Sequence, residues 1–334
     1  MAERSTISQA VQIGVEATPG TAVTATRRLG SIGVEVGAQI DTTPQRPNGQ
    51  KYANLQVLGK EWGEASLSGA PAYTELPYLF SSLLSTPTVT PVLDGATPTG
   101  AHLWTFDSAS FTADNPKTYT IEQGDSARAH RVTYALLQAL TMEWSRNEVS
   151  LDGTMVTRRL EDGITMTPGG VMLPQVPVRP SELSVYMDAA ATDLGTTKMT
   201  RTISGEWSVG SRYEPVWVVD AALPSFAAHV ESEPDASFTL MQQANAQGME
   251  SLVAMRGGAT RFCRLEAVGP IIAGAGATAT RHRMILDMAG QVSDVAPYSD
   301  EDGVYAVEWT FGAVHDPDWQ RALRVQVITT TSAL

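Results

Sequence analysis

Short runs in which apolar and polar residues alternate are the feature of this sequence that most constrains its fold. Such runs lie at residues 32–36, 140–144, 149–151 and 305–311, and Gly, Pro, Asn and Asp separate them from their neighbours. Side chains on a strand point to opposite faces in turn, so each run predicts a β-strand with one buried face. We therefore expect a mainly β protein. The pattern argues against doubly wound α/β folds and TIM barrels, because both need a helix after nearly every strand.

The composition limits the classes of function that the chain can have. Its 334 residues are 43% hydrophobic and 18% charged, which suffices for one or two domains with a sizeable core. Acidic residues outnumber basic ones by 36 to 23, and the formal charge of -13 argues against a DNA-reading role. The single cysteine, Cys263, excludes an intramolecular disulfide and a multi-cysteine metal site and fits a reducing compartment. No uninterrupted apolar run has the length of a signal peptide or a membrane span, so we expect no membrane insertion.

Helical periodicity appears in two short segments. Residues 74–85 and 246–256 each place apolar residues three and four positions apart, as a helix with one buried stripe requires. The apolar positions are Leu76, Leu79, Phe80, Leu83 and Leu84 in the first segment and Met249, Leu252 and Val253 in the second. A constant shift of 173 residues superimposes the two stripes.

The strands that precede these helices match at nearly the same shift. Residues 64–68 (EASLS) resemble residues 235–239 (DASFT) at a shift of 171, and residues 34–37 resemble residues 207–210 at a shift of 173. Three successive elements thus keep their order and spacing. This regularity predicts an internal duplication of a β-rich unit with one short flanking helix.

The duplication divides the chain into two domains. The first unit is expected at residues 1–170 and the second at residues 171–334, with a Pro-rich linker at about 167–180. The alternative interpretation is chance, because short β patterns match one another at many offsets.

Candidates for catalytic, metal-binding and cofactor-binding residues each have a simpler structural interpretation. The Gly-Asp-Ser sequence at 124–126, with His130 nearby, is also found in some serine hydrolases, but it lies between two alternating runs, where a hairpin turn accounts for it. A solvated loop accounts for the histidine and aspartates at 315–318, a polar turn for the acidic run at 300–303 and a strand for Cys263. We therefore expect no catalytic, cofactor-binding or metal-binding residues and no enzyme activity.

The N-terminal residues carry a resemblance to a known family. The run VQIGVEATPGTAVTATRRL at 11–29 looks like the start of the major tail tube proteins of long-tailed, siphovirus-type bacteriophages, in particular those that infect actinobacteria. The layout that follows is similar as well: a strand near 30–37, a long polar segment at 41–55, then a strand and a short helix. The resemblance implies a tail-tube-type β-sandwich or barrel unit without catalytic residues. It also implies assembly into stacked rings whose inner strands form a β-barrel around a DNA channel.

The resemblance makes other copies of the chain its expected partners. Two units per chain predict a ring of three chains with pseudo-sixfold symmetry, and a ring of six chains is the alternative. The family also implies contacts with other tail proteins, transient and non-specific passage of DNA, and a place in the virion tail after assembly in the host cytoplasm. Two other functions stay open: another virion β protein such as a tail tip, adaptor or capsid-decorating subunit, and a carbohydrate-binding or hydrolytic β-sandwich.

The alternating strands suggest which side chains line such a channel. In residues 64–68 and 235–239 the acidic and hydroxyl residues share one face, while alanine and a large apolar residue share the other. The helix that follows needs an apolar surface to cover, so the acidic face points away from it, toward the lumen of a tube whose helices pack outside. The expected lumen-facing residues are Glu64, Ser66, Asp235 and Ser237, together with Glu143 and Glu308, which alternate with apolar neighbours. The alternative is that these carboxylates are ordinary solubilising charges on the exterior.

Two further segments are expected to contact neighbouring rings. The segment at 41–55 is too long and polar for a hairpin, and we expect it to become ordered when it meets a neighbouring subunit. The C-terminal run at 324–331 alternates like a strand and is suited to extend a sheet in the same or an adjacent protomer. The expected inter-ring contact residues are Pro44, Arg46, Asn48, Lys51, Val325 and Val327. The alternative for both segments is a mobile surface position.

Overall fold

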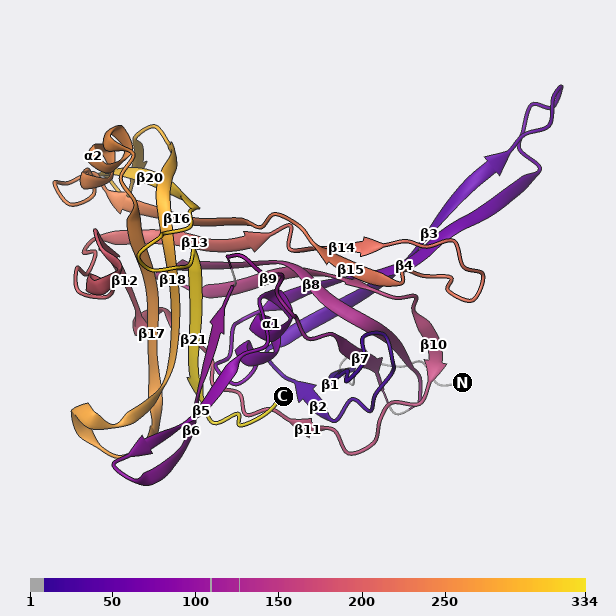
Figure 1. The fold of residues 1–334 in the computed structure, drawn as a ribbon, viewed down its shortest axis with the longest axis horizontal. Coiled ribbons are helices and arrows are strands. Elements are labelled where there is room, and N and C mark those ends of the chain that lie inside the picture. Colours follow the sequence, from indigo (N-terminus) through magenta and orange to yellow (C-terminus); the bar gives the residue numbers. More distant parts are fainter. Residues whose placement is uncertain (1–8, 109, 126) are drawn as a thin grey trace.

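The computed structural model describes residues 9–108, 110–125 and 127–334 (Figure 1). The described part of the chain is mainly β, as the alternation predicts, and it contains two α-helices, α1 (Leu76–Leu83) and α2 (Glu250–Gly257). Both helices overlap the segments that helical periodicity predicts. Three short 3₁₀ helices lie in connections, at Pro180–Glu182, Ala191–Asp193 and Gly276–Thr278.

Eight strands form one continuous antiparallel sheet, which we call the central sheet. In spatial order they are β3 (Ile32–Gln45), β4 (Leu55–Gly69), β9 (Val149–Thr157), β8 (Ala129–Ser145), β13 (Thr202–Gly210), β16 (Asp235–Gln243), β20 (Val304–Ala313) and β18 (Thr280–Val295). The first four strands come from the first half of the sequence and the last four from the second half. Because β8 pairs directly with β13, the sheet continues across the Pro-rich linker.

The long strand β8 leaves the central sheet at its N-terminal end and enters a second sheet. There it pairs with β7 (Tyr119–Gly124) on one side and β10 (Glu161–Ile164) on the other. β7 pairs in turn with β1 (Ala10–Val15), and β1 pairs with β2 (Arg27–Leu29). The short strand β11 (Val171–Met172) runs parallel to β2 and is the one parallel pairing among the described strands.

The long strand β18 makes the same transition in the second half of the chain. Its N-terminal end pairs with β17 (Arg261–Ala273) on one side and β21 (Leu323–Thr329) on the other. β17 pairs in turn with β12 (Leu183–Asp188). On the other side, β21 pairs with β6 (Thr97–Asp107), which forms a hairpin with β5 (Thr88–Asp94).

Six strand pairings occur in the same arrangement in both halves. In the first half they are β1–β7, β7–β8, β8–β10, β8–β9, β9–β4 and β4–β3. In the second half they are β12–β17, β17–β18, β18–β21, β18–β20, β20–β16 and β16–β13. The registers of two hairpins match as well: Val34 lies opposite Leu67 in the first half, and Trp207 lies opposite Phe238 in the second. These are the residue pairs that the shifts of 173 and 171 superimpose.

The apolar face of the central sheet packs on a large hydrophobic core that contains α1. Every residue of α1 is buried, and the ring of Phe80 lies 6.0 Å from that of Trp207 and 5.7 Å from that of Phe106. The second helix, α2, lies closer to the surface. Its predicted apolar stripe is only partly correct, because Leu252 packs against the core whereas Val253 is exposed.

The N-terminal run at 11–29 is fixed to the fold by a buried carboxylate. Glu16 follows β1 and is only 5% exposed. It accepts hydrogen bonds from the backbone N–H groups of Gly20 (2.6 Å) and Tyr134 (2.9 Å) and from the hydroxyl groups of Thr118 (2.8 Å) and Thr120 (3.0 Å). These bonds satisfy the carboxylate in the interior, so Glu16 anchors the following turn on β7 and β8.

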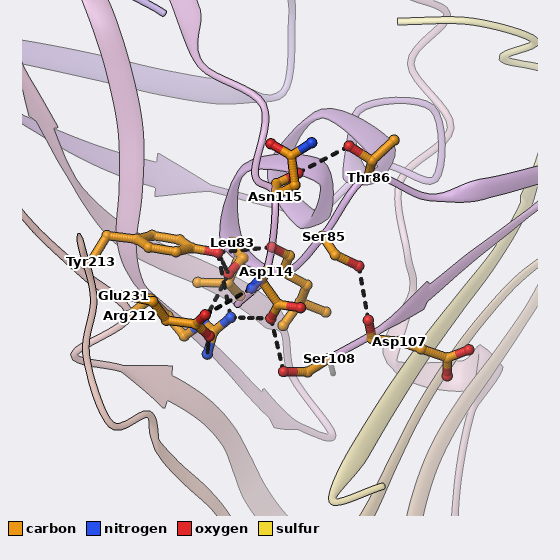
Figure 2. A network of polar contacts seen from close by, with 11 residues as sticks. Leu83, Ser85, Thr86, Asp107, Ser108, Asp114, Asn115, Arg212, Tyr213 and Glu231 are labelled. Atoms are coloured by element: carbon orange, nitrogen blue, oxygen red, sulfur yellow. Dashed lines mark hydrogen bonds and ion pairs between the residues drawn. The ribbon is translucent and has the colours of Figure 1, made fainter. Parts of the chain in front are cut away.

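A second buried cluster connects the two halves of the chain (Figure 2). Arg212, directly after β13, forms ion pairs with Asp114 and with Glu231, the latter at 3.1 Å. Its Nε donates a hydrogen bond of 3.0 Å to the carbonyl oxygen of Leu83 at the C-terminal end of α1. The side chains of Arg212 and Asp114 are each 1% exposed. This cluster fixes the start of the next element to the end of α1.

That next element is a two-stranded arm, β14 (Tyr213–Val216) and β15 (Ala228–Glu231), which extends alongside the β3–β4 hairpin (Figure 1). A small second core joins the arm to the neighbouring strands, and its buried residues are Tyr134, Leu136, Val156, Tyr213 and Phe226. Trp62 on β4 contacts Trp217 edge to face at 5.8 Å between ring centroids. One further strand, β19 (Ser299–Glu301), pairs with β20.

The expected loop at 41–55 and two of the expected inter-ring contact residues are wrong. The segment at 41–55 is not a free loop, because β3 and β4 pair as far as Gln45 and Leu55 and only residues 46–54 form the tip of a long hairpin. The C-terminal strand β21 extends a sheet of its own protomer, between β18 and β6, which is one of the two placements expected from its alternation. Val325 and Val327 are both 0% exposed, so they cannot make the contacts with a neighbouring ring that the alternation suggested.

Candidate functional site

The face of the central sheet that points away from the core carries mainly small and polar side chains, except near the β14–β15 arm, where Trp62, Val156 and Leu136 pack into the small second core. We call it the polar face. It consists of the residues that alternate with core residues in the eight strands. One row of directly opposite residues on this face crosses all eight strands. In spatial order this row is Gly33, Ser68, Asp152, Thr141, Ser208, Ser237, Gly312 and Gln291. The two-residue period of the strands thus yields a hydrophobic face and, along this row, a continuous hydrophilic one from a single sheet.

Eight carboxylates lie on the polar face. They are Glu35, Glu64, Glu143, Asp152, Glu206, Asp235, Asp294 and Glu308. One described lysine, Lys60, shares this face of β4 at the hairpin end, where its ammonium lies 5.0 Å from the ring centroid of Trp217. The arginines of β8 and β18 lie in the parts of these strands that pair outside the central sheet. The field over this face is therefore predominantly negative.

The carboxylates are densest where β8, β13 and β20 cross the middle of the sheet. Glu143 and Glu206 lie directly opposite each other, and together with Glu308 they line a shallow hollow in the polar face. Burial raises the pKa of Glu206, and the neighbouring charges of Glu143 and Glu308 raise it further. Glu148 lines the same hollow, and four carboxylates without a cation among the lining residues are suited to repel an anion rather than to bind one.

The six residues expected to face a lumen all lie on the polar face. Glu64 and Ser66 lie on β4, Asp235 and Ser237 on β16, Glu143 on β8 and Glu308 on β20. The sequence interpretation missed four further carboxylates of this face, which are Glu35, Asp152, Glu206 and Asp294. The signal that finds three of them is the same one: Glu35, Asp152 and Glu206 each lie beside a buried apolar residue in an alternating run, and these residues are Val34, Leu151 and Trp207.

The remaining predicted contact residues lie near the tip of the β3–β4 hairpin, which projects from the body of the molecule (Figure 1). Pro44 lies opposite Gln56, one residue pair before the end of the pairing, while Arg46, Asn48 and Lys51 lie in the tip. The same hairpin exposes a set of large apolar side chains, namely Ile40, Tyr52, Leu55, Val57 and Leu58. A projecting hairpin with this composition is suited to dock on another protein surface.

Two edges of the central sheet have no strand partner among the described residues. The outer edge of β3 is one of them, since β3 pairs only with β4. The other is the C-terminal part of β18, where residues 291–295 pair with β20 on one side and extend beyond the last β17 partner on the other. Both edges present unpaired backbone groups that can accept a further strand.

The segments considered for catalysis or metal binding have structural roles where they are described. Gly124 pairs with Ala129, and Asp125 accepts backbone hydrogen bonds across the turn, so the hairpin prediction is confirmed, while Ser126 lies outside the described residues. His315 contacts Ser110, and burial raises the pKa of the Cys263 thiol inside β17. In the described ranges no three His, Cys, Asp or Glu residues are grouped as a metal site, and no helix is long and apolar enough to cross a membrane.

Comparison with known proteins gives no assignment for this chain. No protein-family model matches the sequence, and no curated protein matches it either. The polar face, the two open edges and the projecting hairpin are therefore the features from which a function can be inferred.

Proposed function

We propose that this protein is the structural subunit of a phage tail tube, which polymerises into stacked rings that form the channel for DNA passage. The observation that carries the proposal is the central sheet: eight antiparallel strands, one face on the core, one face hydrophilic, and both edges open. A sheet of this kind can close into a barrel by pairing edge to edge with other copies, which removes the exposed edges.

The number of strands supports a ring of three chains. Strands about 4.8 Å apart and tilted by about 40° give a barrel of 24 strands a diameter of about 48 Å, and side chains occupy about 5 Å on each side. A duplex about 20 Å wide passes through such a barrel with clearance. Two chains give a barrel diameter of about 32 Å, which leaves only about 2 Å beyond the width of a duplex. Six chains give about 96 Å, far wider than a duplex needs.

The charge of the polar face supports its place on the channel wall. DNA sticks to proteins mainly through contacts between phosphates and lysine or arginine side chains. The described positions of the polar face carry eight carboxylates and one lysine, Lys60, at the hairpin end. Such a wall lets DNA slide because it offers few phosphate contacts at any sequence.

The repeated strand pairings support a tandem duplication of one tube unit. With units at 1–170 and 171–334, three chains supply six equivalent units, and the ring has pseudo-sixfold symmetry. The partners of the chain are then other copies of itself and other tail proteins, its place is the virion tail after assembly in the host cytoplasm, and it has no catalytic role.

The experiment that tests the proposal is electron microscopy of the purified protein after concentration, combined with native mass spectrometry. We expect rings or tubes with a central hole and a ring mass of three 35.7-kDa chains. A ring of six chains would contradict the trimer but leave the tube function intact. A protein that stays monomeric and binds glycans in an array, or hydrolyses them, would overturn the proposal in favour of a carbohydrate-active β-sandwich. Isolated spikes or collars without tubes would indicate another virion protein.

A further inference from the structure

The pairing of β8 with β13 inside the chain is a template for the pairing that the two open edges lack. Along this seam, Met142 lies opposite Trp207 on the core side and Thr141 lies opposite Ser208 on the polar face. The hydroxyl oxygens of Thr141 and Ser208 are 3.1 Å apart. The seam is antiparallel, and its core-facing residues Leu140, Met142, Trp207 and Val209 are all 0% exposed.

The open edge of β3 is the counterpart of β13 at this seam. In the second half of the chain, Ser208 lies opposite Ser237. Glu35 takes the matching place opposite Ser66 in the first half, so Glu35 corresponds to Ser208. The equal registers of the β3–β4 and β13–β16 hairpins make this correspondence unambiguous.

The open end of β18 is the counterpart of β8 in the same way. Thr141 lies two strands away from Ser68 along a row of directly opposite residues, through β9. Asp294 lies two strands away from Thr239 along the corresponding row, through β20. Because Ser68 and Thr239 hold matching places in the two hairpins, Asp294 corresponds to Thr141, and Val295 corresponds to Met142.

The burial of the edge residues shows what a partner would cover. Val36, Val292 and Val295 point to the core side but are only partly buried, whereas their counterparts at the inner seam are fully buried. A strand added at each edge would remove this apolar surface from water and satisfy the exposed backbone groups.

We infer that the strand added at each edge is the opposite edge of a second copy of this chain, with Asp294 of one chain directly opposite Glu35 of the next and Val295 directly opposite Val34. The contact is antiparallel and joins two different surfaces, so its repetition by rotation closes a ring rather than a two-fold dimer. This register is a statement about the interface of the proposed tube and rests on that proposed function.

Cysteine cross-linking tests the register directly. Directly opposite residues on one face have Cβ atoms about 5 Å apart, near disulfide range, while diagonal neighbours are about 7 Å apart or more. The wild-type chain has only the buried Cys263, so it provides a background without cross-links. The double variant Glu35→Cys with Asp294→Cys is assembled under reducing conditions, checked for rings by electron microscopy, and then oxidised. We expect covalent dimers and trimers on a non-reducing gel.

Two matched variants and one internal control make the result decisive. Gly33→Cys or Gly37→Cys, each combined with Asp294→Cys, places the thiol two residues away on the same face and should cross-link about tenfold less. Thr141→Cys with Ser208→Cys should form the same disulfide within one chain, which shows that this pair geometry accepts it. Rings that cross-link best through Gly33 or Gly37, or not at all, would overturn the register while leaving the tube function standing. Absence of rings in the wild-type protein would overturn the proposed function itself.

Discussion

Glu143 on β8 and Glu206 on β13 lie directly opposite each other across the strand pairing that joins the two halves of the chain. Two like charges at this distance destabilise a strand pair, so the pairing is held by what lies on the other face of the same strands. There Met142 lies opposite Trp207, and both are fully buried. The core side of the seam stabilises the pairing, and the polar side carries charges that the fold itself does not need.

This arrangement predicts a specific pH dependence. The pKa of Glu206 is raised in the folded state by burial and by the charges of Glu143 and Glu308. The carboxyl group therefore loses its proton at a lower pH in the unfolded chain than in the folded one. Above both pKa values its ionisation lowers the free energy of unfolding. This loss of stability disappears as the pH falls through the raised pKa of the folded state to the ordinary pKa of the unfolded state. The variant Glu206→Gln should be more stable than the wild type by about 0.5 kcal/mol at pH 7 and should lose this advantage at pH 4.

Thermal unfolding of both proteins across this pH range measures the effect. Asp94→Asn, which changes an exposed carboxylate at the end of β5 and outside the hollow that Glu206 lines, serves as the control and should follow the wild-type curve at each pH. An advantage of Glu206→Gln that grows as the pH falls would contradict the account.

The buried ion cluster at Arg212 predicts a large loss of stability. Arg212→Met leaves the buried carboxylate of Asp114 and the carbonyl oxygen of Leu83 without their guanidinium partner. Removing one partner of a buried ion pair costs about 3–5 kcal/mol. Chemical denaturation should show this loss, whereas Arg128→Met, which removes an exposed ion pair with Asp162, should leave the midpoint nearly unchanged. Equal midpoints for the two variants would mean that the cluster does not anchor the arm.

Reversing charges on the polar face should convert a non-binding wall into a DNA-binding one. Glu64→Lys combined with Asp235→Lys should leave assembly nearly intact, because exposed charges contribute little to stability, and should make the tubes retain short DNA duplexes at low salt. Filter binding at several salt concentrations measures this retention, which should fall steeply as salt rises.

The control for this experiment places the same two charges elsewhere. Asp94 at the end of β5 and Asp193 in a 3₁₀ helix are exposed and lie outside the central sheet, and their replacement by lysine gives an equal change in net charge. Tubes of this control should retain much less DNA, and infectivity of a phage that carries the polar-face variant should drop. Equal retention by both variants would place Glu64 and Asp235 on an ordinary exterior surface.

The β3–β4 hairpin should be required for ring stacking and dispensable for folding. Thr42 lies opposite Leu58, so replacing residues 43–57 by Asn-Gly closes the hairpin with a two-residue turn and keeps the register of the remaining strands. We expect a folded protein that forms single rings without tubes, measured by circular dichroism, sedimentation and microscopy. A second variant, Tyr52→Ser with Leu58→Ser, keeps the hairpin and removes part of its apolar surface, and it should shorten the tubes. Normal tubes from the shortened hairpin would contradict this role.

The sequence predicts those parts of the fold in which one face of a strand is buried. The alternation at Val34 and Val36, and at Trp207 and Val209, indicates both strands and both of their faces, and the same pattern places Glu64 and Asp235 on the polar face. It fails for residues 41–55, because the tip of a hairpin that projects into solvent has no buried face to impose a period.

Other features depend on long-range contacts that a local pattern does not contain. The alternation at Val325 and Val327 correctly indicates a strand, but not that β18 and β6 occupy both of its edges. The amino-acid composition of β8 and β18 does not indicate where along each strand the pairing strands change. The cluster at Arg212 joins residues that are 98 and 129 positions apart, and nothing near Arg212 in the sequence distinguishes it from a surface arginine.

The central claim is that the central sheets of three chains close into one barrel with the polar face inside. A density map of the assembled tube, viewed down its axis, tests this claim most directly. The account predicts three chains per ring, six equivalent wall segments, and Glu143, Glu206 and Glu308 exposed to the central channel. A map in which this face points outward, or in which β3 and β18 of neighbouring chains do not pair, would contradict it.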